Sequence, residues 1–137
     1  ETGAAVRRCT TAASTGALYS AFAAVGLEYG PAFRTVEAAW AGAGEAAARR
    51  RRRAALQGTQ VHPADLDGAL QASSLLARGG GEGGGATRLP FGVNAARLRG
   101  RAAGALLAEV AGRGAEAADV RLAACRARCS DELDEPA

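Results

Sequence analysis

Residues 61–71 read VHPADLDGALQ, and this stretch decides the fold. Pro63 carries no amide proton, which costs nothing in the first turn of a helix, so the sequence predicts a helix that begins at Pro63 and runs to about Ala77. Leu66, Leu70 and Ala77 share one stripe of this helix, and we expect that stripe to face the core.

The segment before this helix, residues 18–40, reads LYSAFAAVGLEYGPAFRTVEAAW. Three apolar residues recur at helical spacing, with capping residues before them and a glycine after them, so the sequence predicts a short amphipathic helix. These residues are Leu18, Phe22, Val25, Ser14, Thr15 and Gly26. Two glycines and a proline within the following GLEYGPAF break the helix and turn the chain.

A strand hairpin is expected next. Residues 33–40, FRTVEAAW, predict the first strand, Gly42 to Gly44 the turn and residues 45–56 the second strand. Five successive arginines, Arg49 to Arg53, lie in the second strand, and we expect them to face solvent along an edge of the sheet. A nucleic-acid patch is the alternative, and the lack of interleaved aromatic residues for base stacking argues against it.

The part of the chain after the central helix predicts a loop and three strands. The run GGGEGGG at 79–85 is expected to be flexible, and it lacks the Lys and Ser/Thr of a phosphate-binding loop. The strand-like segments are LPFGVNAARL, GALLAEVA and ADVRLAAC. We therefore expect an α+β domain over residues 14–129, a lead-in or linker over residues 1–13 and an acidic tail over residues 130–137.

Composition limits the classes of function. The 137 residues suffice for one domain. The chain has 17 arginines and no lysine, and its net charge is +3. The absence of Met favours a segment of a longer polypeptide. Three Cys and one His make no recognisable zinc signature, so reduced thiols in a cytoplasmic protein are expected. We expect neither a membrane span nor a signal peptide.

The segments LYSAFAAVGLEYGPAFRTVEAAW, VHPADLDGALQ and LPFGV, in this order and spacing, resemble the C-terminal half of dehydratase domains from modular or iterative polyketide synthases. The resemblance covers about Leu18 to Leu122. It implies a single hot-dog fold, an antiparallel sheet wrapped around a central helix, and a complete dehydratase made of two such folds. In that family the first hot dog supplies a catalytic His within HxxxGxxxxP, a motif that this sequence lacks. The implied partners are that upstream hot dog, an acyl carrier protein and other polyketide synthase domains.

In this family the second hot dog supplies an Asp in a DxxxQ or DxxxH pattern, which falls here on Asp67 and Gln71. The implied reaction removes water from a 3-hydroxyacyl chain on the carrier protein and gives a 2,3-alkene. Elimination needs a base for the proton beside the thioester and an acid for the hydroxide leaving group. Asp67 suits the acid if a water-poor pocket outweighs the helix dipole, and Gln71, on the same helix face, can hydrogen-bond its carboxyl. The alternative for Asp67 is an ordinary first-turn helix acid.

Other residues receive roles by the same resemblance. At the position of Asp65 the family more commonly has Leu, so Asp65 is expected to point away from the pocket toward solvent. His62 precedes the helix and is expected to serve at its entrance. Tyr29, Gly30 and Pro31 match the YGP motif near the substrate hydroxyl, to which Tyr29 can donate; a packed ring with its hydroxyl at the surface is the alternative.

The resemblance also implies residues that form the wall of the substrate pocket. It implies no metal or nucleotide cofactor. Elimination of water needs only proton transfers, and the substrate arrives on the phosphopantetheine of the carrier protein. The residues expected to contact substrate are Gly30, Pro31, Leu70, Pro90 and Phe91.

The leading interpretation is therefore the acid-bearing half of a dehydratase, inactive alone. A noncatalytic hot-dog module for scaffolding or carrier-protein binding is the first alternative, because fold alone does not establish activity. A relative that cyclises or isomerises the chain is the second, and a basic RNA-binding protein is a distant one. We expect neither a nucleic-acid nor a membrane partner.

Overall fold

The computed structural model describes residues 7–55, 57–76, 92–97, 104–114 and 117–124. Helices and strands follow one another in the order β1, α2, β2, β3, α3, β4 and β5 within these ranges. Their bounds are Thr11–Ala13 for β1, Thr15–Ala24 for α2, Val36–Gly42 for β2, Glu45–Arg53 for β3, Pro63–Ser73 for α3, Gly104–Gly112 for β4 and Ala118–Ala124 for β5.

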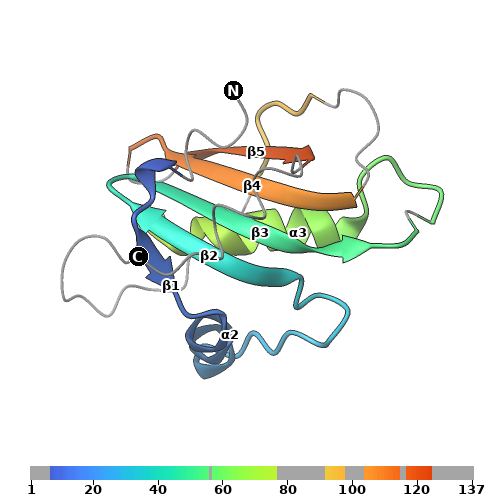
Figure 1. The fold of residues 1–137 in the computed structure, drawn as a ribbon, viewed down its shortest axis with the longest axis horizontal. Helices are drawn as coiled ribbons and strands as arrows, with labels where there is room; N and C mark the ends of the chain where they lie inside the picture. Colours follow the sequence, from blue (N-terminus) through green and yellow to red (C-terminus); the bar gives the residue numbers. More distant parts are fainter. Residues whose placement is uncertain (1–6, 56, 77–91, 98–103, 115–116, 125–137) are drawn as a thin grey trace.

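The strands of the described residues form one antiparallel sheet in the order β1-β2-β3-β4-β5. Helix α3 lies in the connection between β3 and β4 and packs against one face of this sheet, where it contacts β2, β3, β4 and β5 (Figure 1). Helix α2 follows β1 and packs beside β2. The expected α+β fold, with a helix across an antiparallel sheet, is confirmed.

Small side chains line the sheet face under α3. Ala46 and Ala48 of β3 stand opposite Val110 and Ala108 of β4, and all four are buried. Directly opposed residues of antiparallel strands share a face, so these four lie on the side that the helix covers. The alanines of β3 leave room for the helix backbone to approach the strand closely.

The expected position of the arginine run was wrong. Strand β3 pairs with β2 on one side and with β4 on the other, so it is an interior strand and not an edge. Arg50 belongs to the same alternate set as Ala46 and Ala48, and 0% of its surface is exposed. Arg51 and Arg52 are exposed, as expected for the run as a whole. Alternation along the strand therefore turns Arg50 inward and Arg51 outward, and a register irregularity between Arg50 and Arg53 interrupts the alternation after them.

Helix α2 confirms the predicted helix and its caps. The Ser14 hydroxyl oxygen accepts a hydrogen bond from the Ala17 amide at 3.1 Å, and Gly26 takes a positive φ of 86° beyond the last turn. Leu18 is buried, but Val25 is 52% exposed and lies outside the packed stripe.

Helix α3 begins at Pro63 as predicted, but it ends at Ser73 and not near Ala77. The expected core stripe was also wrong: Leu66 is 51% exposed and Leu70 is half-buried. The helix instead turns a face of small and polar residues toward the sheet, because the backbone comes too close for large side chains. This buried face consists of Ala64, Asp65, Gly68, Ala69, Gln71 and Ala72.

Strand β1 pairs with β2, so residues 11–13, which were expected in the lead-in, lie inside the sheet. Strands β4 and β5 confirm two of the three predicted C-terminal strands, whereas residues 92–97 form none. The glycine-rich run at 79–85 and the acidic tail lie outside the described residues. Among the described helices, none has the length and apolar character needed to cross a membrane.

Gly68 generates the first prediction. A Cβ at this position would collide with the Thr35 hydroxyl and come within 3.4 Å of the Arg50 Nε. We expect Gly68→Ala to lower the free energy of unfolding by about 1–3 kcal/mol, measured by denaturant titration. Gly16→Ala is the matched control, because a Cβ on this exposed residue of α2 meets only the Ser14 hydroxyl at 3.7 Å. Equal effects of the two substitutions would contradict the close approach of helix and sheet.

Candidate active site

His62 organises the start of α3. Its Nδ1 accepts a hydrogen bond from the Ala64 amide at 3.2 Å, and its Nε2 lies 2.9 Å from the Gln57 side-chain oxygen. With Nδ1 accepting, Nε2 carries the proton and donates to Gln57. The imidazole therefore caps the helix, as the helix-entrance role predicted.

Asp67 and Gln71 meet one turn apart on α3, as their spacing predicted. The Gln71 Nε2 donates to Asp67 Oδ2 at 2.7 Å, and Asp67 is half-buried. The same nitrogen donates to the backbone oxygen of Phe33 at 3.0 Å. The Gln71 Oε1 accepts from the Tyr19 hydroxyl at 2.9 Å, and that hydroxyl accepts in turn from the Val36 amide at 3.1 Å. Hydrogen bonds from α2, β2 and the preceding turn thus fix the amide that contacts Asp67.

Tyr29 lies close to this pair. Burial raises the pKa of the Tyr29 phenol, the charge of Asp67 raises it further, and a hydrogen bond with Gln71 lowers it. The ring packs edge-on against Phe22 at 5.1 Å and against Tyr19 at 6.0 Å between centroids. The ring of Tyr29 is therefore packed, as the alternative expected, and its hydroxyl faces the Asp67–Gln71 pair.

The turn after Tyr29 is exposed and is held by its own backbone. The Gly30 carbonyl accepts from the amides of Phe33 and Arg34, at 3.0 and 3.1 Å, while Gly30 and Pro31 are open to solvent. Of the other residues expected to contact substrate, Leu70 is half-buried, and Pro90 and Phe91 lie outside the described residues.

Asp65 does not point to solvent, contrary to the expectation. It is 2% exposed, and its Oδ1 lies 2.7 Å from Nη2 of the fully buried Arg50. Arg53 donates to the same carboxylate through Nε at 3.1 Å and Nη2 at 3.3 Å. A carboxylate under the sheet is tolerated because two guanidinium groups compensate its charge. Two residues correspond to about 200° of helical rotation, so Asp65 faces the sheet, whereas the half-buried Asp67 lies on the flank of the helix beside Gln71.

Arg50 is a buried cation with incomplete hydrogen bonding. Burial lowers the pKa of its guanidinium, and the charge of Asp65 raises it. The contact with Asp65 is close enough for an ion pair, but none of the three guanidinium nitrogens has a well-aligned hydrogen bond within the described residues. Attraction to Asp65 is thus the main compensation for removing this charge from water.

Sequence reasoning missed Tyr19 and the Phe33 carbonyl. Tyr19 lies next to the recognised Leu18 and three residues before Phe22, so the same helical spacing could have placed it on the buried side of α2. Its contact with Gln71 joins residues 52 apart in the sequence, which no local pattern encodes. The Phe33 carbonyl had no sequence signal, because every residue carries such a group.

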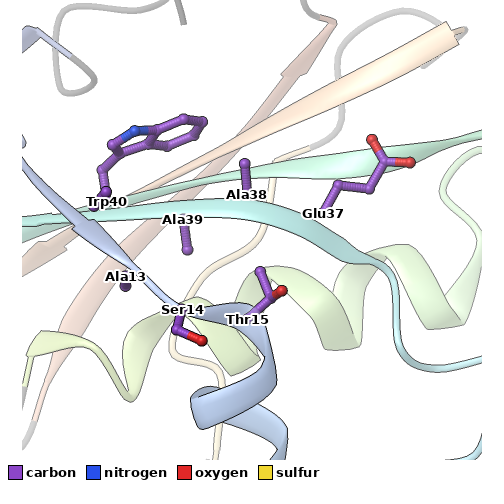
Figure 2. A pocket seen from close by; sticks show the side chains of 8 residues that line it. Ala13, Ser14, Thr15, Glu37, Ala38, Ala39 and Trp40 are labelled. Atoms are coloured by element: carbon purple, nitrogen blue, oxygen red, sulfur yellow. The ribbon is translucent and has the colours of Figure 1, made fainter. Parts of the chain in front are cut away.

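A groove of about 400 Å³ lies elsewhere, where β1 passes into α2 beside β2. Figure 2 shows Trp40 and Ala38 on one side of β2, Ala39 on the other, and Ser14 and Thr15 at the start of α2. Asp67, Gln71 and Tyr29 are not among its lining residues. In the described part of the chain, no cluster of three or more His, Cys, Asp or Glu side chains is placed to hold a metal ion.

A family model described as the polyketide synthase dehydratase N-terminal domain matches residues 1–129. The chain belongs to the polyketide synthase dehydratase family. No curated protein matches it.

Solved structures agree with the fold of this family. The dehydratase domain of the CurK module of curacin polyketide synthase, in an inactive aspartate-to-asparagine mutant, has a TM-score of 0.72 at 21% identity, over 86% of this chain and 44% of that one. Another structure of the CurK dehydratase is an inactive histidine-to-phenylalanine mutant. The erythromycin dehydratase has a TM-score of 0.69 at 28% identity, over 83% of this chain and 40% of that one. The fold is that of a hot dog, and the chain spans less than half the length of these dehydratases.

The position of Tyr29 gives a prediction that can be tested without an assay of enzyme activity. Because the charge of Asp67 raises the pKa of Tyr29, removing that charge by Asp67→Asn is expected to lower the Tyr29 pKa. Tyrosinate absorbance during a pH titration measures the change, and Tyr29→Phe assigns the signal. Asp119→Asn, at an exposed position, is the control and should leave the titration unchanged. An unchanged Tyr29 titration in Asp67→Asn would place the two groups apart.

The buried ion pair generates a second prediction at this site. Asp65→Leu leaves the Arg50 charge buried against an apolar partner and is expected to cost about 3–5 kcal/mol of unfolding free energy. The double variant Arg50→Leu/Asp65→Leu removes both charges and should recover most of this loss, because a packed apolar pair often replaces a buried ion pair at little cost. Denaturant unfolding of the two single variants and the double variant gives the coupling energy. Additive effects would contradict the pairing.

Proposed function

We propose that this chain is the C-terminal, acid-bearing hot dog of a polyketide synthase dehydratase. In this proposal Asp67 protonates the departing hydroxyl of a 3-hydroxyacyl thioester on an acyl carrier protein, and a 2,3-alkene forms. Gln71 holds the Asp67 carboxyl, and Tyr29 donates a hydrogen bond to the substrate hydroxyl. The observation that carries the proposal is the 2.7 Å contact between Gln71 Nε2 and Asp67 Oδ2, beside the Tyr29 phenol.

The geometry of the carboxyl supports the role of an acid. Gln71 donates to Oδ2, so this oxygen serves as an acceptor and the transferable proton belongs on Oδ1. A fixed carboxyl loses less freedom when it approaches the leaving group, which favours proton transfer. Asp65 is unsuited to the task, since Arg50 and Arg53 compensate its charge under the sheet.

The base is proposed to come from an upstream hot dog. His62 is the single His of the sequence, and both of its ring nitrogens have protein partners at the helix start. The inactive mutants of the CurK dehydratase, one at an aspartate and one at a histidine, support a reaction that needs both residue types. The chain covers 44% of that dehydratase, which leaves room for a second hot dog to supply the histidine.

The matching family model is named for the N-terminal domain, whereas the DxxxQ pattern of α3 favours the C-terminal half. We assign the chain to that half on the motif, because Asp67 and Gln71 lie one turn apart on the helix and contact one another. The proposed partners are the histidine-bearing hot dog, an acyl carrier protein and neighbouring synthase domains in the cytoplasm. Proton transfer alone accomplishes the elimination, so no metal or nucleotide cofactor is proposed.

The test is dehydration of 3-hydroxyacyl-carrier-protein by the chain fused to the upstream hot dog, followed by mass spectrometry. We expect Asp67→Asn to reduce turnover by about 10²- to 10⁴-fold, because the amide cannot supply the acid proton. Asp119→Asn, with a similarly small change at an exposed position, should retain activity. The isolated chain should be nearly inactive, since one group cannot act on both sides of the substrate.

Two outcomes would overturn this proposal. Full activity of the Asp67→Asn fusion would mean that the acid lies elsewhere. Alkene formation by the isolated chain would mean that it contains its own base. Carrier-protein binding without turnover by the unaltered fusion would instead favour the noncatalytic module.

A further inference from the structure

We propose that Arg51 is a positioning residue, which holds the turn at residues 29–34 so that its Phe33 carbonyl fixes Gln71 and, through Gln71, the carboxyl of Asp67. The role in catalysis rests on the function proposed above. The contacts themselves do not, so they can be tested separately.

Arg51 connects the end of β3 to this turn by two contacts. Its Nη2 donates to the backbone oxygen of Pro31 at 3.1 Å, and its backbone amide donates to the Thr35 carbonyl at 2.7 Å. The side chain is exposed, so packing does not explain its orientation. A charged donor to a carbonyl gives a stronger hydrogen bond than a neutral donor, and the strand fixes the base of the side chain.

The turn meets the helix through one carbonyl. The Phe33 oxygen accepts from Gln71 Nε2 at 3.0 Å, and Gln71 Nε2 also donates to Asp67 Oδ2 at 2.7 Å. One nitrogen thus divides its two protons between the turn and the candidate acid. If the turn moves, the amide loses its partner at Phe33 and keeps only the Tyr19 hydrogen bond at its oxygen, so the donor to Oδ2 of Asp67 is held less firmly.

A second arginine supports the other end of the turn. Arg34 donates through Nε to the Tyr29 carbonyl at 2.8 Å, and its guanidinium lies 5.5 Å from the centroid of the Tyr19 ring. Arg34 belongs to the turn and contacts the turn itself and the Tyr19 ring, whereas Arg51 reaches the turn from strand β3. Arg51 is therefore the residue of the arginine run that sets the turn relative to β3.

Strand β3 is a suitable anchor because the adjacent Arg50 holds it against α3. Arg50 pairs with Asp65 beneath the sheet, and Arg51, one residue later, faces the opposite way and reaches Pro31. Consecutive residues of one strand thus contact the helix and the turn that together carry the candidate acid. Arg52 is exposed and makes no side-chain hydrogen bond or ion pair within the described residues, so it provides a matched control.

The experiment compares Arg51→Met with Arg52→Met in the chain fused to the upstream hot dog, the form expected to be active. Methionine keeps an unbranched apolar stem and removes the donor. We expect Arg51→Met to lower kcat by about 5- to 10-fold with KM changed by less than about twofold, because it disturbs positioning and not substrate binding. Arg52→Met should match the unaltered protein, and Arg51→Lys, which keeps a charged donor, should restore most of kcat.

A second measurement is independent of activity. In protein labelled at glutamine nitrogen, the side-chain amide signals of Gln71 report its hydrogen bonds, and those of Gln57 and Gln60 serve as internal references. Arg51→Met should shift or broaden the Gln71 signals, and Arg52→Met should not. Unmoved Gln71 signals in Arg51→Met, or equal effects of the two variants, would overturn the proposal. If the unaltered protein does not dehydrate the substrate, the proposed function fails, while the Gln71 signals still decide the positioning role.

Discussion

A guanidinium with no solvent contact lies against a carboxylate with almost none, at the place where β3 meets the start of α3. Arg50 Nη2 and Asp65 Oδ1 are 2.7 Å apart, and Arg53 approaches the same carboxylate from a partly exposed position. Removing Asp65 alone leaves the Arg50 charge uncompensated in a region of low polarity, whereas removing Arg50 alone leaves the buried carboxylate with Arg53 as its partner. Loss of the carboxylate alone is therefore more costly than replacement of both Asp65 and Arg50. The register of α3 on the sheet is therefore specified by charge as well as by the fit of small side chains.

The orientation of the candidate acid follows from this constraint. With Asp65 and Gly68 against the sheet, the helix has little freedom to rotate about its axis. The Thr35 hydroxyl adds a hydrogen bond to the Ala64 carbonyl at 3.2 Å. Asp67, about 200° around the helix from Asp65, then lies on the flank of the helix, beside Gln71 and Tyr29.

Much of the fold could be predicted from local patterns. The HP pair placed the start of α3, Ser14 placed the start of α2, and the four-residue spacing of Asp67 and Gln71 predicted their hydrogen bond. These features depend on neighbours within one turn, where sequence spacing is also spatial spacing.

The environment of the arginine run could not be predicted in this way. Five identical residues give no contrast from which to identify the inward set, and β3 is an interior strand only because β4 arrives after the helix. In the structure, Arg50 continues the alternate set of the buried Ala46 and Ala48. Asp65 could have been identified as its partner only if the helix was already known to cross that strand. The wrong predictions for Arg50, Asp65 and Leu66 therefore have one cause: the helix presents small and polar residues to the sheet.

The hydrogen bonds of Gln71 limit what this residue can do. Its amide nitrogen has two protons, one directed to the Phe33 carbonyl and one to Asp67, and its oxygen accepts from Tyr19. No donor of Gln71 remains for a substrate, so under the proposed function Gln71 positions the acid and does not touch the reacting atoms. Tyr29 keeps a hydroxyl proton and a pKa raised by burial and by Asp67, which preserves it as a donor. Under the proposed function, proton transfer therefore falls to Oδ1 of Asp67, the oxygen that Gln71 does not contact, with the Tyr29 hydroxyl beside it.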